Sequence, residues 1–374
     1  MSVRRLAAPE DLATPHPLPA RSPVPQRITA VAVTTDLSRT AIATAAPWFR
    51  DFAEVLVLAD GAVTRLAIPD RRRVHDLLFD PDGTALTAMA SRNSLYRWAL
   101  DDPGERWPLG MTGSGGSLDL PLAQVAVGGR SFATANAFTQ NVVVRDAQTR
   151  RVHHDIRETF KDLAYDDRVV GEGTVALNAD GSRLAFCRPR RSFLKEDEGV
   201  VVQEVGSGTH TEHRTGIPWA NGLAFRPDGA ALAVVGARPG ETVATILDLN
   251  DPADDPVDDP VDGLADEPAD GGAHDPEPVV LPTDQRVDRI NLRPVWCGAE
   301  PRVPIVDPHR VTVWNLASGS AILSVDVPGP RIAATLTPDG RTLVIASPDD
   351  GVHAHPLPSP SPPPTSAPRR TPLP

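Results

Sequence analysis

Hydrophobic residues occur along this chain in short stretches that alternate with turn-forming residues. Within the stretches, apolar and β-branched residues recur at every second position or run without a break, which is the pattern of β-strands rather than of helices. Gly, Pro, Asp and Asn separate one stretch from the next. The clearest predicted strands are Glu54–Leu58, Ser94–Trp98, Asn141–Asp146, Val200–Glu204, Val243–Asp248 and Val311–Asn315. The pattern therefore predicts an all-β protein.

One hairpin recurs along the sequence, and its best example is Leu77–Leu86, which contains Phe79-Asp80-Pro81-Asp82-Gly83. Proline fixes φ at the first turn position, aspartate accepts a hydrogen bond from the local backbone, and glycine adopts a positive φ. An apolar strand before this turn and another after it complete the hairpin. Further copies are Leu223–Leu232, Ala334–Leu343, the weaker Val175–Leu184, and two degenerate copies centred on Asp36 and Gly128.

The spacing of the hairpins predicts a ring of similar units. The hairpins centred on Asp36, Asp82, Gly128, Asp180 and Asp228 are 46, 46, 52 and 48 residues apart. Without the head, the acidic insertion and the tail, seven units average about 43 residues each, a length typical of a four-stranded propeller blade. The long gap between Asp228 and Asp339 leaves room for one more unit, which we place near Arg293, in Ile290–Trp296. The last unit ends after three strands, so its outer strand must come from the N-terminal segment, from Ser2–Ala7. The sequence thus predicts a single β-propeller of seven four-stranded blades, closed by an N-terminal strand.

Charge and proline content set apart three segments from this ring. Twelve Asp or Glu and no Lys or Arg lie between Asp248 and Glu277, and this segment accounts for the net charge of −12. Prolines interrupt the segment, so we expect a disordered acidic insertion at about 249–278. Six prolines lie in residues 1–25 and nine in residues 356–374. We therefore divide the chain into an N-terminal segment (1–25) that supplies the closing strand, the propeller (26–356) and a disordered proline-rich tail (357–374).

The repeats resemble those of the WD-repeat β-propeller family over about residues 26–356. The resemblance rests on the Phe-x-Pro-Asp-Gly hairpins and on Trp98 and Trp314-Asn315, which stand where that family has its Trp-Asp pair. The Gly-His pair that opens a typical repeat is absent, so the buried His–Ser–Asp–Trp network of the family is not implied. Tol-type and lactonase-type propellers share the Pro-Asp-Gly hairpin. The resemblance implies a non-catalytic scaffold or sensor module that binds a protein or peptide.

The strand order of that family implies which connections share a face of the ring. Hairpin turns and third-to-fourth strand connections lie on one face, from which the acidic insertion should leave. Second-to-third connections and the links between blades lie on the other face, and Arg and aromatic residues, which are enriched at interaction hot spots, gather in them. We expect this second face to bind a partner, in our hypothesis an acidic peptide. Its candidate residues are Trp48, Arg50, Arg71, Arg72, Arg73, Arg92, Arg190, Arg191, Phe193, Trp219 and Arg238, with Arg214 and Arg302 as further members.

The sequence contains no residue pattern that identifies an enzyme. It lacks Gly-x-Ser-x-Gly and a phosphate-binding loop that ends in Gly-Lys-Ser/Thr. His353 and His355 share a strand face, but two ligands are too few for a closed metal site. We therefore expect no catalytic residue, no cofactor and no metal. The alternative is a lactonase-like propeller hydrolase with a metal in the central channel, for which the candidate ligands at the inner ends of the first strands are Asp76, Asn221 and Asn291.

Charge and hydropathy restrict the partners and the location that we expect. Outside the acidic insertion the chain is neutral and has no continuous basic stripe, so nucleic acid is not an expected partner. No apolar run approaches the roughly 20 residues of a membrane helix. The N-terminus, Met1-Ser2-Val3-Arg4-Arg5, is not followed by the apolar stretch of a signal peptide. We expect a cytoplasmic protein with no membrane partner, and the oligomeric state stays open.

Overall fold

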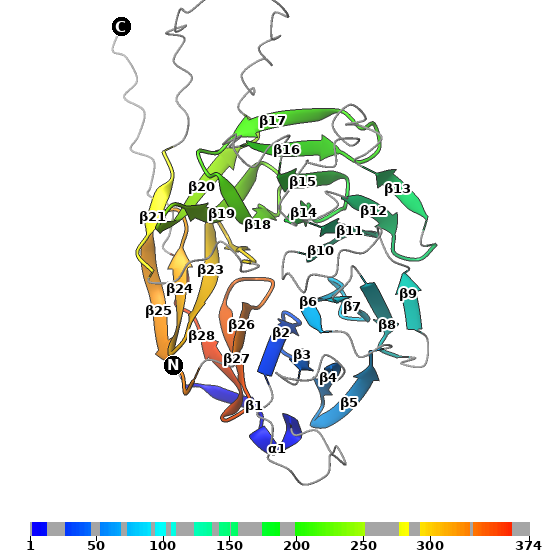
Figure 1. Cartoon of the computed structure of the whole chain (residues 1–374), viewed down its shortest axis with the longest axis vertical. Helices are drawn as coiled ribbons and strands as arrows, with labels where there is room; N and C mark the ends of the chain where they lie inside the picture. Colours follow the sequence, from blue (N-terminus) through cyan, green and yellow to red (C-terminus); the bar gives the residue numbers. More distant parts are fainter. Residues whose placement is uncertain are drawn as a thin grey trace, which may run out of the picture.

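The computed structural model describes residues 2–12, 27–45, 53–68, 73–90, 94–101, 106–109, 123–136, 142–149, 151–155, 174–187, 199–250, 277–283, 292–329 and 332–360. Its strands form seven four-stranded antiparallel sheets, which follow one another in chain order around a central axis (Figure 1). This confirms the predicted fold, a seven-bladed β-propeller. The described part contains no helix that is long and apolar enough to cross a membrane.

Each blade runs from an innermost strand at the axis to an outermost strand at the rim. The innermost strands of blades 1 to 7 are β2 (Arg27–Val33), β6 (Val74–Phe79), β10 (Ala123–Gly128), β14 (Val175–Leu177), β18 (Trp219–Phe225), β22 (Val295–Cys297) and β26 (Ala333–Leu336). The second strands are β3 (Arg39–Ala45), β7 (Ala85–Ala90), β11 (Ser131–Asn136), β15 (Arg183–Cys187), β19 (Ala231–Arg238), β23 (Glu300–Asp307) and β27 (Thr342–Ser347). The third strands are β4 (Ala53–Ala59), β8 (Ser94–Ala99), β12 (Val143–Asp146), β16 (Gly199–Glu204), β20 (Glu241–Asp248), β24 (Arg310–Asn315) and β28 (Gly351–Pro356). The outermost strands are β5 (Ala62–Ala67), β9 (Arg106–Leu109), β13 (Val152–Asp155), β17 (His210–Arg214), β21 (Val279–Leu281), β25 (Ser320–Asp326) and β1 (Arg4–Ala7).

The N-terminal strand closes the ring, as predicted. β1 pairs antiparallel with β28, and Arg4 lies opposite Ala354. The short helix α1 (Pro9–Leu12) follows, and Ala7 and Leu12 are buried in an apolar cluster with residues of blades 7 and 1. The first and the last parts of the chain therefore share one blade, and the outer edge of β28 is covered.

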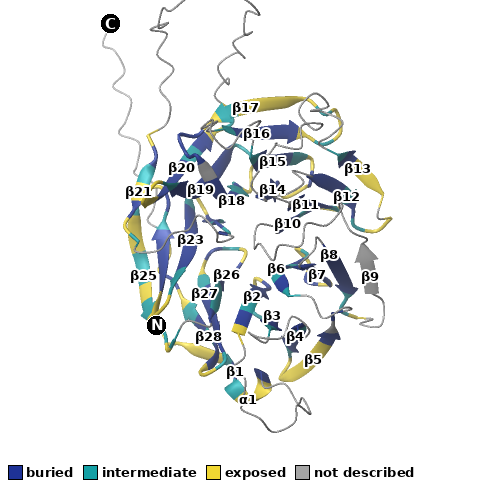
Figure 2. Ribbon diagram, in the orientation of Figure 1, coloured by how far each residue is buried: buried dark blue, intermediate teal, exposed yellow. Residues whose placement is uncertain are grey.

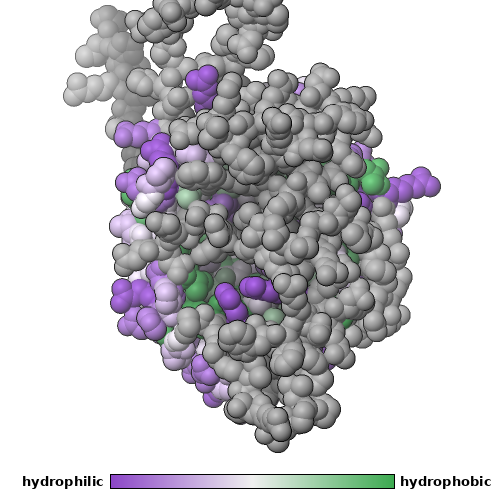
Figure 3. All heavy atoms as spheres, in the orientation of Figure 1, coloured by the Kyte–Doolittle hydropathy of each residue, from purple (hydrophilic) through white to green (hydrophobic). Residues whose placement is uncertain are grey.

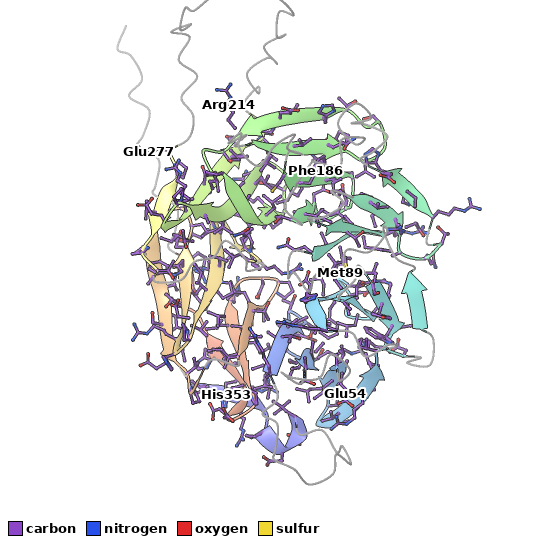
Figure 4. All side chains as sticks on the ribbon, viewed as in Figure 1. Glu54, Met89, Phe186, Arg214, Glu277 and His353 are labelled. Atoms are coloured by element: carbon purple, nitrogen blue, oxygen red, sulfur yellow. The ribbon has the colours of Figure 1, made fainter. Side chains whose placement is uncertain are left out.

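Burial follows the position of a strand in its blade. The inner and middle strands are buried, whereas outer strands such as β17 and β25 are largely exposed (Figure 2). Both faces of an inner strand pack against neighbouring blades, so these strands are apolar on both faces. The second strands pack in the same way: Met89 on β7 contacts Leu95, Val125 and Phe132 between blades 2 and 3 (Figure 4). The core is therefore a set of seams between blades.

The hairpin turns explain why Pro-Asp-Gly recurs in the sequence. In blade 2 the N–H of Gly83 donates to the carbonyl oxygen of Asp80 at 2.8 Å, and the N–H of Asp80 donates to that of Ala85 at 3.0 Å. The Asp82 carboxylate accepts the N–H of Thr84 at 2.9 Å, and Gly83 has a φ of 71°. Aspartate thus satisfies a turn N–H, and glycine supplies the left-handed conformation. The aspartates in the same position of the other hairpins that accept a backbone N–H are Asp36, Asp180, Asp228 and Asp339.

The additional unit predicted near Arg293 is blade 6. It lies where the spacing of the repeats predicts it, but its hairpin turn has a different sequence. β22 and β23 are joined by a two-residue turn of Gly298 and Ala299, in which Cys297 lies opposite Glu300. This turn lies after Arg293 in the chain and contains no Pro-Asp pair. A tight turn of this kind leaves little signal in the sequence beyond its glycine.

The antiparallel strand order gives the ring two distinct ends. The turn face carries the first-to-second and third-to-fourth strand connections, including the hairpins at Asp82, Asp228 and Asp339. The loop face carries the second-to-third connections, such as 238–241, 307–310 and 347–351, and the links between blades. Each innermost strand therefore begins at the loop face and ends at the turn face. These two names are used below.

The acidic insertion comes after a strand that ends at the turn face. It follows β20 in blade 5, where the N–H of Leu249 donates to the carbonyl oxygen of Ala230 in the hairpin turn at 2.9 Å. Residues 251–276 lie outside the described residues, as do residues 361–374 of the proline-rich tail. Leu357, which directly follows β28, is buried in the apolar cluster of blades 6 and 7. The segment that directly follows the last strand is thus anchored to the ring.

Candidate functional site: the loop face and the central channel

Of the eleven residues named first for the predicted interaction face, three lie in the described part of the chain, and all three lie at the loop face. Arg238 ends β19, Trp219 begins β18, and Arg73 directly precedes β6. The other candidates lie outside the described residues: Trp48, Arg50, Arg71, Arg72, Arg92, Arg190, Arg191 and Phe193. The interaction face as a whole therefore stays a prediction.

Arg238 is partly committed to the fold. Its Nε donates to the carbonyl oxygen of Gly216 at 2.8 Å, and Gly216 belongs to the link between β17 and β18. Gly216 has a φ of 62°, and a Cβ at this position would lie 3.1 Å from Nη2 of Arg238. The arginine thus braces a connection of the loop face. Replacing it would change both the surface charge and the position of that connection.

Arg214 presents its charge to solvent. It ends β17, is exposed, and points away from the ring (Figure 4). As the last residue of an outermost strand, it lies at the loop-face end of blade 4. Its position agrees with the predicted face, although at the rim rather than near the axis.

Arg302 does not lie at the loop face, contrary to the prediction. It lies near the start of β23, beside the turn formed by Gly298 and Ala299, and only 1% of its side chain is exposed. Its Nη1 donates to the carbonyl oxygen of Gly340 at 3.0 Å, and its Nη2 to that of Pro358 at 3.1 Å. The prediction was wrong because it placed the hairpin at Arg293. The later turn puts Arg302 at the beginning of the second strand, on the turn face.

At the loop end of the central channel, Asp76 and Arg293 join three blades. Asp76 lies on β6 in blade 2, and Arg293 lies just before β22 in blade 6. Nη2 of Arg293 donates to Oδ2 of Asp76 at 2.5 Å and to the carbonyl oxygen of Val125 in blade 3 at 2.9 Å. The N–H of Val125 donates to Oδ2 of Asp76 at 3.0 Å, and the N–H of Leu77 donates to Oδ1 at 3.1 Å. Oδ2 is therefore used in a link that crosses the ring, and Oδ1 accepts an N–H of its own strand.

Gln124 makes a second link at the same end of the channel. It lies on β10 and is buried, and its Nε2 donates to the carbonyl oxygen of Asn221 in blade 5 at 2.9 Å. The N–H of Val175 in blade 4 donates to Oε1 of Gln124 at 3.4 Å. The N–H of Leu292 in blade 6 donates to the carbonyl oxygen of Asn221 at 3.0 Å. Together the two links connect blades 2 to 6 across the axis.

Burial raises the pKa of Asp76, and the charge of Arg293 opposes this rise. A carboxylate removed from water holds its charge less readily, and hydrogen bonds to the ionised form compensate in part. A carboxylate with a shifted pKa near a channel can mark a functional site, but ion pairs with a structural role shift pKa values in the same way. The contacts favour a structural role for Asp76, because its oxygens already accept three hydrogen bonds.

The residues that could bind a metal do not gather in the described part of the chain. It holds no group of three or more His, Cys, Asp or Glu side chains suited to a metal ion. The rings of His353 and His355 on β28 are 6.5 Å apart, and Nε2 of His353 lies 2.8 Å from the carbonyl oxygen of Asp350. Burial, together with the charge of His353, lowers the pKa of His355. Asn291, the third candidate ligand for a channel metal, lies outside the described residues.

Gln124 and Arg293 are the residues of this region that the sequence pattern did not reveal as site residues. Gln124 is a polar residue within an apolar first strand and Arg293 lies just before one, and this contrast is the signal that could have marked them. Figure 3 shows hydrophilic and hydrophobic side chains exposed side by side near the middle of the ring. No protein-family model and no curated protein matches this sequence.

Proposed function

We propose that this protein is a non-catalytic interaction scaffold or sensor module of the WD-repeat type, which binds a protein or peptide partner at its loop face. The observation that carries the proposal is that the Asp76 carboxylate is already engaged in hydrogen bonds within the ring. Asp76 is the one carboxylate on the described innermost strands, and its oxygens accept hydrogen bonds from Arg293, Val125 and Leu77. A carboxylate used in this way braces the ring, and it has little capacity left for a metal or for proton transfer.

The ring is well suited to multi-point recognition. One cross-link joins blades 2 and 6 and another joins blades 3 and 5, so the loop-face connections are displayed from a rigid frame. Arg238 and Arg214 supply positive charge there, at the ends of β19 and β17. Arginine is enriched at interaction hot spots and prefers carboxylate partners, which supports an acidic peptide as the partner. A cytoplasmic location remains part of the proposal.

Affinity capture followed by mass spectrometry tests this function. The bait is the full chain, and a matched variant carries Glu at Arg71, Arg72, Arg73, Arg190 and Arg191. A control variant carries Glu at Arg226 and Arg341, which belong to the turn face. We expect specific partners that the loop-face variant loses and the turn-face variant keeps. Partners that both variants capture equally, or no partner above background, would contradict the proposal.

A propeller hydrolase with a metal in the channel is the second candidate. It is favoured by the position of Asp76 and Asn221, which both lie on innermost strands near the loop end of the channel. The metal content of the purified protein discriminates between the two functions. A stoichiometric divalent ion that is lost in Asp76→Asn would support the hydrolase, and its absence would support the scaffold.

A further inference from the structure

Arg293 has hydrogen-bond donors that no described residue accepts. A guanidinium carries five N–H groups, and here Nη2 alone makes the contacts to Asp76 and to the carbonyl oxygen of Val125. The Nη1 and Nε groups donate to no described residue, and 31% of the Arg293 side chain is exposed. Within the described part of the chain, three N–H groups of this arginine therefore have no acceptor and can donate to a ligand.

The position of these donors is set before any ligand arrives. Asp76 holds Nη2 of Arg293, and Asp76 is itself held by the N–H groups of Leu77 and Val125. The backbone beside Arg293 is fixed as well, because the N–H of Leu292 donates to Asn221. An arginine held by a carboxylate loses little side-chain freedom on binding, which reduces the entropic cost of recognition.

The donors also lie at the end of the channel where a partner on the loop face would arrive. Innermost strands begin at the loop face, and Arg293 directly precedes the innermost strand of blade 6. Blades 2, 3 and 6 meet at this side chain. A group bound here would contact the centre of the face, where recognition energy is usually concentrated.

We infer that Arg293 is the anchor for an acidic side chain of the peptide partner, at the centre of the loop face. This inference rests on the proposed function and adds the chemical group of the partner that is recognised. A guanidinium offers donors and no acceptor, so the group that it binds must be an acceptor, and a carboxylate makes the stronger, charge-assisted hydrogen bonds. Asp76 orients the arginine, and its own negative charge limits the affinity for the incoming carboxylate.

This arrangement predicts opposite effects for two substitutions. Arg293→Gln removes the donors and should weaken binding of an acidic peptide at least about tenfold. Asp76→Asn keeps an oxygen that can accept from Arg293 but removes the competing charge, so it should strengthen binding about two- to fivefold. If both residues served only the fold, both substitutions would weaken binding or leave it unchanged.

The test uses fluorescein-labelled hexaglutamate as the probe and measures fluorescence anisotropy with the full chain. Hexaglutamine and hexalysine are the comparison peptides, and Arg341→Gln, an exposed arginine of the turn face, is the control variant. Circular dichroism and the melting temperature of each variant show whether it is folded. Arg293→Lys is the second variant, because it keeps the charge and should retain part of the binding.

The expected result is hexaglutamate binding that Arg293→Gln loses, Asp76→Asn strengthens and Arg341→Gln leaves within twofold. No hexaglutamate binding by the unmodified chain, equal binding of hexaglutamine, or a folded Arg293→Gln that binds as the unmodified chain does would each overturn the inference. The affinity-capture experiment distinguishes a failure of the Arg293 inference from a failure of the proposed scaffold function. Partners that are lost with the loop-face variant but kept by Arg293→Gln would leave the scaffold standing without this anchor.

Discussion

Arg183 at the start of β15 donates through Nη1 to the carbonyl oxygen of Gly229, in the hairpin turn of the next blade, at 2.8 Å. Arg39 makes the same contact to Gly83 at 2.8 Å, and Arg302 makes it to Gly340 at 3.0 Å. In each case the arginine lies just after its own hairpin turn and reaches the glycine of the neighbouring turn. The repeated hairpin therefore has a second role, because its glycine carbonyl receives the side chain that joins two blades.

Loss of one of these contacts should destabilise the ring. Arg183→Ala removes a charge-assisted hydrogen bond and the contact of the guanidinium with the Phe225 ring, so we expect a loss of about 1–2 kcal/mol in the free energy of unfolding. Arg341→Ala is the matched control, because the Arg341 side chain lies on the same face and is 73% exposed. It should change the free energy by less than about 0.5 kcal/mol. Urea denaturation measures both, and equal effects would contradict the role of Arg183.

The seam between blades 3 and 4 depends on backbone contact instead. A Cβ at Gly181 would collide with the carbonyl oxygen of Gly128, and Gly181 has a φ of 77°. Gly240 has a φ of 83° but nothing within 4 Å of its added Cβ. Gly181→Ala should therefore cost about 3 kcal/mol and Gly240→Ala about 1 kcal/mol, since only the first adds a collision to the conformational strain. Similar losses for the two variants in urea denaturation would show that the close approach does not matter.

Ring closure by β1 can be tested by truncation. Deletion of residues 1–20 removes the strand paired with β28 and exposes the apolar surface that Ala7 and Leu12 cover. We expect the melting temperature to fall by several degrees, about 5 °C or more. Deletion of residues 361–374 serves as the control and should leave the melting temperature within about 1 °C. An unchanged melting temperature after the first deletion would exclude closure as a source of stability.

The turn aspartates predict how stability falls in acid. Hydrogen bonds from Ser38 and Thr34 lower the pKa of Asp36 from 3.8 to about 2, and hydrogen bonds chiefly from Thr149 lower that of Asp146 from 3.8 to about 2. Because the folded-state pKa lies below the unfolded value, each carboxylate stabilises the fold above pH 4, and this contribution is lost between about pH 4 and pH 2.

The variant Asp36→Asn/Asp146→Asn keeps oxygens that accept the turn hydrogen bonds but cannot titrate. Its stability should therefore fall less steeply between pH 4 and pH 2 than that of the unmodified chain. Asp326→Asn, in which an exposed carboxylate paired with Arg310 is replaced, is the control. Urea denaturation at a series of pH values measures the slope, and parallel curves for all three proteins would contradict the assignment.

The fold could be predicted because its local chemistry repeats. The Pro-Asp-Gly turns at Asp82, Asp228 and Asp339 need specific residues, so they leave a clear pattern in the sequence. The hairpins of blades 3 and 6 turn on Gly129 and Gly298 without proline or aspartate, so they leave a weaker pattern in the sequence. The misplacement of Arg302 follows directly from this difference.

The links across the channel could not be predicted from the repeat. Asp76 is recognisable as a carboxylate at the inner end of a first strand, but Arg293 follows it by more than 200 positions in the chain. Their contact depends on how seven blades close around one axis, which no local pattern records. Gln124 is missed for the same reason, because its partners lie in blades 4 and 5. The closure of the ring, and not the separation along the chain, determines which polar residues of the innermost strands come into contact.

The position of the bound partner tests the scaffold account most directly. Hydrogen–deuterium exchange of the full chain, measured with and without a partner obtained by capture, compares loop-face peptides covering 214–219, 238–241 and 292–294 with turn-face peptides covering 80–85, 226–231 and 337–342. The account predicts slower exchange in the loop-face peptides only, with the largest change at Arg293. Slower exchange confined to the turn-face peptides would contradict it.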